Sequence, residues 1–325
     1  MYYVLCVSLC AAVVALVGTA CSVVVLALSP LLTRLLRFYP ARLRAQAAFL
    51  VRVLPASTGL LVSLGIVLPA FVLHEPAHTN ERPDFLLMAL AGLGLSLMLA
   101  SAYRAIRAWV RLDRLKRQWM SSARKLTPDQ KGIEIFEVAD PSALIVVTGI
   151  LKPTVFLSRP VVSCLTPSES SAAIAHELAH VSAGDNLKQL LLQATRLPLL
   201  DRLAGLDREW RLASELAADE SAMRSGTPVV ELASALIKVA RLRVVRPLLP
   251  ESAVSYFLPP GKDSMLSTRV EHLKRLLEKG DKVDPAAPVA PIHLLGVALI
   301  VAVFSVLITH PNLLLLTHTL LEKLV

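Results

Sequence analysis

Charged residues are scarce in this sequence. They account for 18% of the 325 residues, while 54% are hydrophobic; a soluble globular protein usually carries about 25% charged residues. This shortage argues against a soluble protein and favours an integral membrane protein. A transmembrane helix needs roughly 20 apolar residues, and four stretches are predicted to be spans: 2–28, 53–73, 85–103 and 292–310.

The first apolar stretch lacks a basic residue. A secretory signal peptide would need a basic leader followed by a short apolar core, and this stretch is longer than such a core. We therefore expect it to be retained as a membrane anchor.

Cysteine is also rare. The four cysteines have spacings that suggest neither a disulfide framework nor a zinc ribbon. Free cysteine usually behaves as a small, buried apolar residue. We therefore interpret all four as apolar filler: Cys6, Cys10, Cys21 and Cys164.

Acidic residues are missing between the first and second predicted spans. In the loop between the second and third spans, by contrast, most of the charged residues are acidic. Basic residues are dense after the third span: Arg104, Arg107, Arg111, Arg114, Lys116 and Arg117. The net charge of +9 is thus explained by loops beside the bilayer rather than by direct binding of nucleic acid. The positive-inside rule predicts a multi-pass protein of the inner (plasma) membrane, with its amino terminus and its carboxyl-terminal tail outside and residues 104–291 in the cytoplasm.

The chain divides into three predicted parts. Residues 1–104 hold three transmembrane helices, 105–290 form a cytoplasmic α+β domain long enough for its own core, and 291–325 hold a fourth span and a short external tail. Alternating and β-branched segments predict a small antiparallel sheet, at 133–138, 143–149 and 154–159. Helices are predicted after it, at 167–182, from 187, and at 207–224, 227–244 and 266–279.

The first of these helices contains the motif HELAH, at residues 176–180. Residues four apart project from the same face of a helix, so His176 and His180 are candidates to hold one metal ion. Glu177 follows the first histidine, as in the HExxH arrangement of zinc metallopeptidases. In such a site the metal activates water and polarises the scissile carbonyl, and we expect Glu177 to act as the catalytic base.

Local signals define the ends of the motif helix. Thr166 fits the N-cap, Pro167 fits the first helical position, and Glu169 completes a capping box. Gly184 fits the C-terminal stop. The sequence therefore predicts a well-formed helix around the two histidines.

A catalytic zinc ion needs three protein ligands and one open position. The segment ELAAD, in the predicted helix 207–224, offers Glu215 as the third ligand. Asp219 lies one turn later, where it is predicted to bond the free ring nitrogen of a ligand histidine. Glu209 and Glu220 remain alternative third ligands on the same helix.

Two other residues have competing interpretations. Asp185 follows a helix-stopping glycine, and we interpret it as a cap of the next helix, with Asn186 as the alternative cap, rather than as a ligand. His272 is a candidate to stabilise an oxyanion, but its segment, STRVEHLKRLLEKG, is more typical of a solvated amphipathic helix.

The order of three spans, a cytoplasmic HExxH domain and a fourth span resembles the BlaR/MecR-type membrane zinc peptidases. Residues 154–186 and 209–224 resemble the active-site segment and the third-ligand helix of that family. The resemblance implies a zincin-like domain of the gluzincin type, with Zn²⁺ held by His176, His180 and Glu215. It also implies that Glu177 is the base and that extended substrate pairs along 154–159.

The chain departs from that family in one respect, because no external penicillin-binding sensor domain follows the fourth span. HtpX-type membrane peptidases are a near alternative, although they usually place two spans after the catalytic helix. The segment 190–200 is too short for such a span and is interrupted by Arg196.

Three functions are compatible with these features. The first is a membrane zinc endopeptidase that cleaves a cytoplasmic regulator, such as a transcriptional repressor, or itself during signal transduction. The second is a quality-control protease for membrane proteins, and the third is a non-hydrolytic membrane transducer. The sequence leaves the substrate, the inducing signal and the oligomeric state open.

Overall fold

The structure is a computed structural model. It describes residues 1–76, 82–130, 133–139, 145–195, 203–242, 255–256 and 263–278, together with Leu315 and Thr319. The fourth predicted span, 292–310, and the predicted boundary at 290/291 lie outside these residues.

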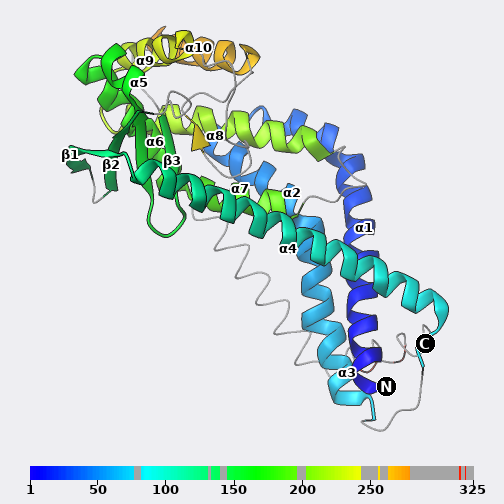
Figure 1. Ribbon diagram of the computed structural model, residues 1–325. Coiled ribbons are helices and arrows are strands. Elements are labelled where there is room, and N and C mark those ends of the chain that lie inside the picture. Colours follow the sequence, from blue (N-terminus) through cyan, green and yellow to red (C-terminus); the bar gives the residue numbers. More distant parts are fainter. Residues whose placement is uncertain are drawn as a thin grey trace.

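Three long helical segments form one end of the molecule (Figure 1). They are α1 (Tyr2–Leu36), α2 (Ala41–Val62), which continues through the π-helical turn η1 (Ser63–Val67) into α3 (Leu68–His74), and α4 (Phe85–Met120). All three segments are long and apolar enough to cross a membrane. These are the first three of the four spans predicted from the sequence.

All three segments extend beyond the predicted spans at their basic ends. α1 continues past residue 28 to Leu36, α2 begins at Ala41 rather than at 53, and α4 continues past residue 103 to Met120. Apolar length limits only the part that lies in lipid. Arginine, leucine and lysine are strong helix formers, so the helices continue beyond the apolar stretch, and the predicted boundary at 104/105 falls inside α4.

The membrane helices approach one another closely at glycines. A β-carbon on Gly94 of α4 would lie 1.9 Å from the carbonyl oxygen of Ala11 in α1, and one on Gly59 of α2 would lie 2.9 Å from that of Val14. Only glycine avoids a clash at these two positions, as in other close transmembrane helix pairs. Both α2 and α4 therefore pack directly against the backbone of α1.

Among the described residues the sheet has five strands: β1 (Arg124–Gln130), β2 (Ile133–Val138), β3 (Ile145–Thr148), β4 (Thr154–Ser158) and β5 (Ser255–Tyr256). Their order is β1-β2-β4-β3-β5. β2 and β4 are parallel, while the other pairs are antiparallel.

The prediction of a purely antiparallel sheet was wrong. After β2 the chain passes over the position of β4 and forms β3, and β4 then returns between the two strands. Because β3 runs opposite to β2 and pairs antiparallel with β4, β4 runs in the same direction as β2. Local patterns specify which segments are strands, but they do not specify this order.

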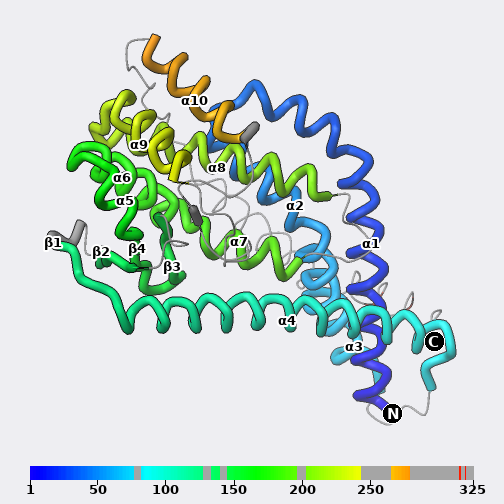
Figure 2. The backbone as a smooth tube through the Cα atoms, turned by 45° about the horizontal axis from the view of Figure 1, so that its top comes forward, coloured from blue at the N-terminus to red at the C-terminus, as the bar shows by residue number. Residues whose placement is uncertain are grey.

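Six helices follow the described strands β1–β4 in the described part of the domain, with β5 between the last two. They are α5 (Arg159–Cys164), α6 (Pro167–Ala183), α7 (Asp185–Ala194), α8 (Ala204–Arg224), α9 (Val229–Arg241) and α10 (Asp263–Glu278). Figure 2 shows α4 running from the membrane end to the sheet, where it leads into β1.

Helices α4 and α6 cover opposite faces of the sheet. Ala108, Leu112 and Trp119 of α4 pack against Phe136 and Phe156. On the other face, Ile174 and Leu178 of α6 pack against a second set of strand residues: Ile135, Val147, Val155 and Leu157. The alternation of the strand side chains places both helices in the core.

Helix α6 begins and ends as its sequence predicts. The Thr166 side chain accepts a hydrogen bond from the backbone N–H of Glu169 at 3.2 Å, and the Glu169 carboxylate accepts one from the backbone N–H of Thr166 at 2.8 Å. Gly184 ends the helix in the left-handed conformation, with φ of 69°. The motif therefore lies on a helix that is closed at both ends.

Candidate metal centre

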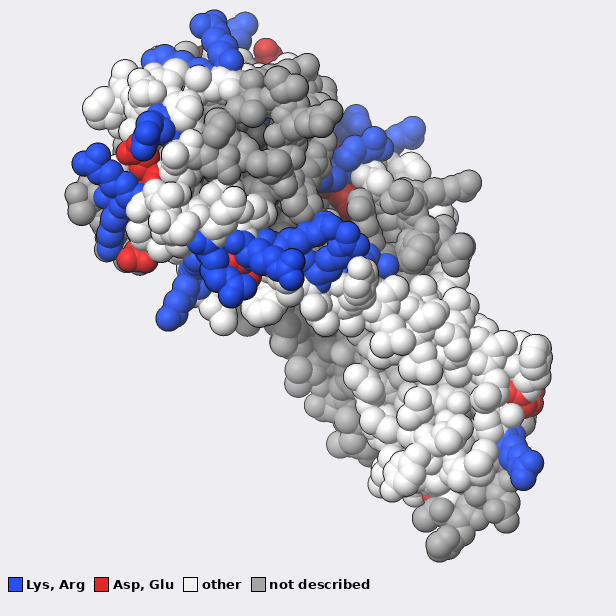
Figure 3. All heavy atoms as spheres, viewed as in Figure 1, with Lys and Arg blue, Asp and Glu red and all other residues white. Residues whose placement is uncertain are grey.

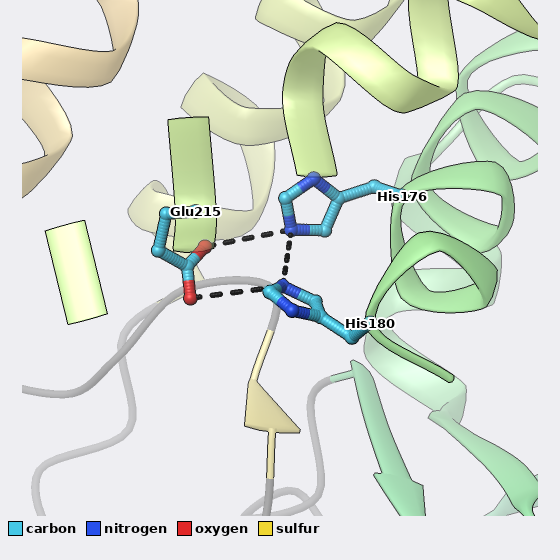
Figure 4. Close-up of side chains that lie close together, drawn as sticks. All are labelled: His176, His180 and Glu215. Carbon is cyan, nitrogen blue, oxygen red and sulfur yellow. Dashed lines mark hydrogen bonds and ion pairs between the residues drawn. The ribbon is translucent and has the colours of Figure 1, made fainter. Parts of the chain in front are cut away.

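The two motif histidines face each other on one side of α6. Their Nε2 atoms lie 3.2 Å apart, and both rings are buried. The spacing of four residues produces this arrangement, because it places both side chains on the same helix face. Figure 4 shows the two rings turned toward the same point.

Glu215 reaches this point from α8. Its Oε2 lies 3.4 Å from His176 Nε2, and its Oε1 lies 3.8 Å from His180 Nε2 (Figure 4). One donor atom from each of the three side chains lies within 4.8 Å of the others. Two imidazole nitrogens and one carboxylate oxygen are typical of a catalytic zinc site, so the three side chains fit a single zinc ion.

The two alternative third ligands, Glu209 and Glu220, contact other residues instead. Glu209 forms an ion pair with Arg44 of α2. Glu220 lies 3.2 Å from His272 and 3.7 Å from Arg224. Among the described residues, Glu215 is the carboxylate that groups with both histidines.

An aspartate contacts the Nδ1 atom of each motif histidine. Asp219 Oδ1 lies 2.9 Å from His176 Nδ1, and Asp185 Oδ2 lies 2.7 Å from His180 Nδ1. A carboxylate on Nδ1 holds the ring in the tautomer with a free Nε2 lone pair. The lone pairs of both Nε2 atoms are therefore available to a metal ion on the side that Glu215 also faces.

The prediction that Asp185 caps the next helix was wrong. Gly184 is the N-cap of α7, and no side-chain cap bond is present there. The left-handed turn at Gly184 brings the Asp185 carboxylate back onto the His180 ring. A contact made by such a reversal cannot be recognised from residue type and spacing alone.

Glu177 is fully buried beside this group. Neither of its carboxylate oxygens has a hydrogen-bond partner among the described residues. Burial raises the pKa of Glu177 to about 8, because removal from water disfavours the charged form. Buried polar atoms rarely lack partners, and this carboxylate is consistent with a group that acts on a bound molecule.

Sequence reasoning missed Arg269, on α10. Its guanidinium is fully buried, with Nη1 2.9 Å from Glu215 Oε2 and Nη2 2.6 Å from Asp219 Oδ1. The segment around it resembles a solvated helix, so no local signal distinguishes this arginine from its neighbours. His272 lies one turn later and contacts Glu220 rather than the metal group.

The charges around the histidines change their proton affinity. Burial and the nearby Arg269 oppose protonation of His176, but Asp219 and Glu215 outweigh them and raise its pKa. For His180, burial also opposes protonation, and the bond from Asp185 together with the charge of Glu215 raises the pKa. Arg269 and His176 outweigh burial at Asp219 and lower the pKa of its carboxyl group. The carboxylates around the two histidines therefore favour a positive charge at this centre.

The strand predicted to pair with substrate is not at an edge. β4, which covers 154–158, lies between β2 and β3. The outer edge of β3 is instead paired with β5, through Val146 with Tyr256 and Val147 with Ser255. β5 also contacts α6, so it lies at the side of the sheet that faces the metal centre.

The model of peptidase family M48 matches residues 111–316, which is more than half of the chain. The matched region includes His176, His180 and Glu215. No curated protein and no solved structure matches the chain.

Proposed function

The chain belongs to peptidase family M48, and we propose that it is a membrane-embedded zinc endopeptidase in which His176, His180 and Glu215 hold the metal. One observation carries this proposal. The donor atoms of these three residues lie within 4.8 Å of one another, beside a buried Glu177 that has no hydrogen-bond partner among the described residues.

A zinc ion at this position would supply Lewis-acid chemistry, by activating water and polarising a carbonyl group. Glu177 acts as the general base, which accepts a proton from the attacking water and passes it to the leaving amine. A general base works best when its pKa lies near the working pH, and burial raises the pKa of Glu177 from 4.5 to about 8.

The remaining charged residues keep this machinery in place. Asp219 and Asp185 orient the two imidazole rings. Arg269 bonds Glu215 and Asp219 together and offsets part of their negative charge. We expect this arrangement to keep Glu215 next to the Nε2 atoms of both histidines.

We place the catalytic domain in the cytoplasm. Figure 3 shows Lys and Arg side chains gathered over α4, between the apolar helices and the domain that carries the sheet. Basic residues at the end of a span favour the cytoplasmic side. A BlaR/MecR-type arrangement, with the amino terminus and the carboxyl-terminal tail outside, agrees with this distribution.

The proposed substrate is a protein chain in the cytoplasm, either a regulator or the enzyme itself. Extended peptides often bind by adding a strand to a sheet edge. β5 already occupies the edge of β3 beside α6, which favours a role for this part of the chain as a competitor or as a substrate. Quality control of membrane proteins is the alternative if the cleaved proteins are unfolded membrane proteins.

The test uses the full-length protein in lipid nanodiscs with casein as a general substrate. We expect about one zinc ion per chain, cleavage that a chelator abolishes and that zinc restores, and products of self-cleavage detectable by mass spectrometry. Bound zinc without any cleavage would support the non-hydrolytic transducer instead. Absence of both would overturn the proposed function.

A further inference from the structure

Arg52 lies on α2, at the point where α7 ends and α8 begins. Its Nε donates a hydrogen bond to Asp207 Oδ1 at 2.8 Å, and its Nη1 donates to the backbone carbonyl of Thr195 at 3.4 Å. The two charged residues are buried, with 4% and 6% exposure. One guanidinium from a membrane helix therefore bonds two helices of the peptidase domain.

The burial of this ion pair makes it different from the surface pairs of the molecule. Exposed pairs contribute little to stability because water screens the charges. In a buried pair, loss of one partner leaves the other charge without compensation, which is strongly unfavourable. α8 therefore cannot move away from Arg52 without breaking this buried ion pair.

The two helices that Arg52 bonds also support the metal centre. α7 begins with Asp185, which holds His180, while α8 carries Glu215 about two turns after Asp207. Helices as short as α7 and α8 each move nearly as a rigid body. A displacement of either helix at its membrane end is therefore transmitted to the metal centre.

Further contacts join the membrane helices α2 and α4 to the end of α7 and to α8. Ala45 and Ala48 of α2 form an apolar cluster with residues of α7 and α8: Leu192, Trp210 and Ala213. Arg104 of α4 donates to the backbone carbonyls of Gln193 and Ala194, at 3.4 and 3.5 Å. The end of α7 is thus bonded by arginines from two membrane helices.

We propose that Arg52 is a positioning residue for the metal centre. It sets the separation of α7 and α8, and it makes the distance between His180 and Glu215 depend on the position of α2 in the membrane. This inference rests on the proposed function, because it takes His176, His180 and Glu215 as the metal ligands. A shift of α2 would then change metal binding and turnover.

The main experiment compares R52M with the parent protein in nanodiscs. Metal affinity is measured by competition with a chelator, and kcat and KM are measured with casein. R52M should bind zinc at least about tenfold more weakly, the lower end of the loss seen when outer contacts of a metal site are removed, and kcat should fall more than KM rises. The matched control is R34M, at an exposed arginine near the end of α1, which should leave both quantities unchanged.

Two further variants address folding. The exchange R52D/D207R restores an arginine–aspartate pair between α2 and α8, and it should recover most of the lost affinity. R52K keeps the charge but loses the planar fork of arginine, and it should show an intermediate loss. Parent-like zinc affinity and kcat in R52M, or in R52K where R52M does not fold, would overturn the proposal.

A metal-free measurement separates this inference from the proposed function. Spin labels at Leu187 of α7 and Arg208 of α8, both exposed, report the separation of the two helices after the native cysteines have been replaced by alanine. R52M should broaden the distance distribution, and R34M should not. If the parent protein binds no zinc and R52M still broadens the distribution, the metal site is rejected, but Arg52 is retained as the residue that sets the separation of α7 and α8. An unchanged distribution would reject the positioning role.

Discussion

At the scale of single residues, packing assigns different properties to carboxylates of similar chemistry. Asp219 and Asp185 both face histidine rings. Despite burial, Arg269 and His176 lower the pKa of the Asp219 carboxyl group, and His180 lowers that of Asp185. Glu177 lies in the same region without a hydrogen-bond partner among the described residues, and burial raises its pKa to about 8. The first two can hold the ligands in place as anions, whereas the third is suited to exchange protons.

The role of Glu177 is tested by E177Q. Glutamine keeps the size of the side chain but cannot accept the proton, so we expect zinc to remain bound and hydrolysis to fall by about 100-fold or more. Zinc content and casein cleavage are measured on the same preparation. E220Q is a matched control on α8, and it should cleave at the parent rate. A parent-like rate in E177Q would exclude Glu177 as the base.

The third ligand is tested by removal of single carboxylates from α8. E215A should lose zinc, because two remaining ligands are too few for the site. E209A and E220A should retain it, since these residues contact Arg44 and His272 instead. Metal analysis of the three purified proteins decides the assignment. Zinc retained by E215A and lost from either control would transfer the role to that residue.

At the scale of elements, α6 depends on one buried carboxylate at its start. Glu169 closes the capping box with Thr166, and it also forms an ion pair with Lys238 at 2.7 Å and accepts from Ser234. These bonds to Lys238, Ser234 and Thr166 outweigh burial and lower its pKa from the ordinary 4.5 to about 2. The same residue therefore ties the start of α6 to α9.

This arrangement predicts a pH-dependent stability. Because the pKa of Glu169 is lower in the folded protein, its contribution is complete above about pH 4.5 and is lost as the pH falls toward 2. E169Q should lower the free energy of unfolding by about 1 kcal/mol at pH 7, the difference between a charged and a neutral hydrogen bond. The measurement is thermal unfolding of the parent and the variant between pH 7 and pH 3.

The control for this measurement is E271Q, which removes an exposed carboxylate paired with Arg275 at 3.4 Å. A surface pair contributes little, so this variant should unfold close to the parent temperature throughout. The gap between E169Q and the parent should narrow on acidification. A gap of constant size from pH 7 to pH 3 would mean that the charge of Glu169 does not stabilise the helix.

At the scale of the whole molecule, the membrane helices and the peptidase domain share one packing arrangement. The basic half of α4 covers one face of the sheet, and α2 packs against α7 and α8. The domain predicted to begin at residue 105 therefore depends on side chains that precede it. These contacts are the basis of the proposal that the position of α2 affects the metal centre.

The orientation of this arrangement is tested by reporter fusions. A reporter that is active only in the cytoplasm should be active after residue 120 or residue 280, and inactive after residue 80 or at the carboxyl terminus. The reason is the imbalance of basic residues between the loops. The four fusions serve as controls for one another. Cytoplasmic activity at the carboxyl terminus would remove the predicted fourth span or invert the whole topology.

Much of the fold follows from local properties of the sequence. Apolar length alone predicts the helices of the first three spans, and capping residues predict both ends of α6. The spacing of His176 and His180 determines that they share a helix face, because helical geometry is the same in every context. The need of a zinc site for a third ligand predicts Glu215, and among the described residues this is the carboxylate that the fold brings to the two histidines.

Other features depend on contacts between segments far apart in the chain. The parallel pairing of β2 with β4, the reversal that brings Asp185 to His180, and the burial of Arg269 all require the folded molecule. The ion pair between Arg52 and Asp207 joins residues from two separate predicted parts. Residue type and periodicity describe only the near neighbours of a residue. The sequence by itself therefore determined the helices and the chemistry of the motif, whereas the partners of each charged group were decided by tertiary packing, since a buried charge takes whichever opposite charge the fold brings within reach.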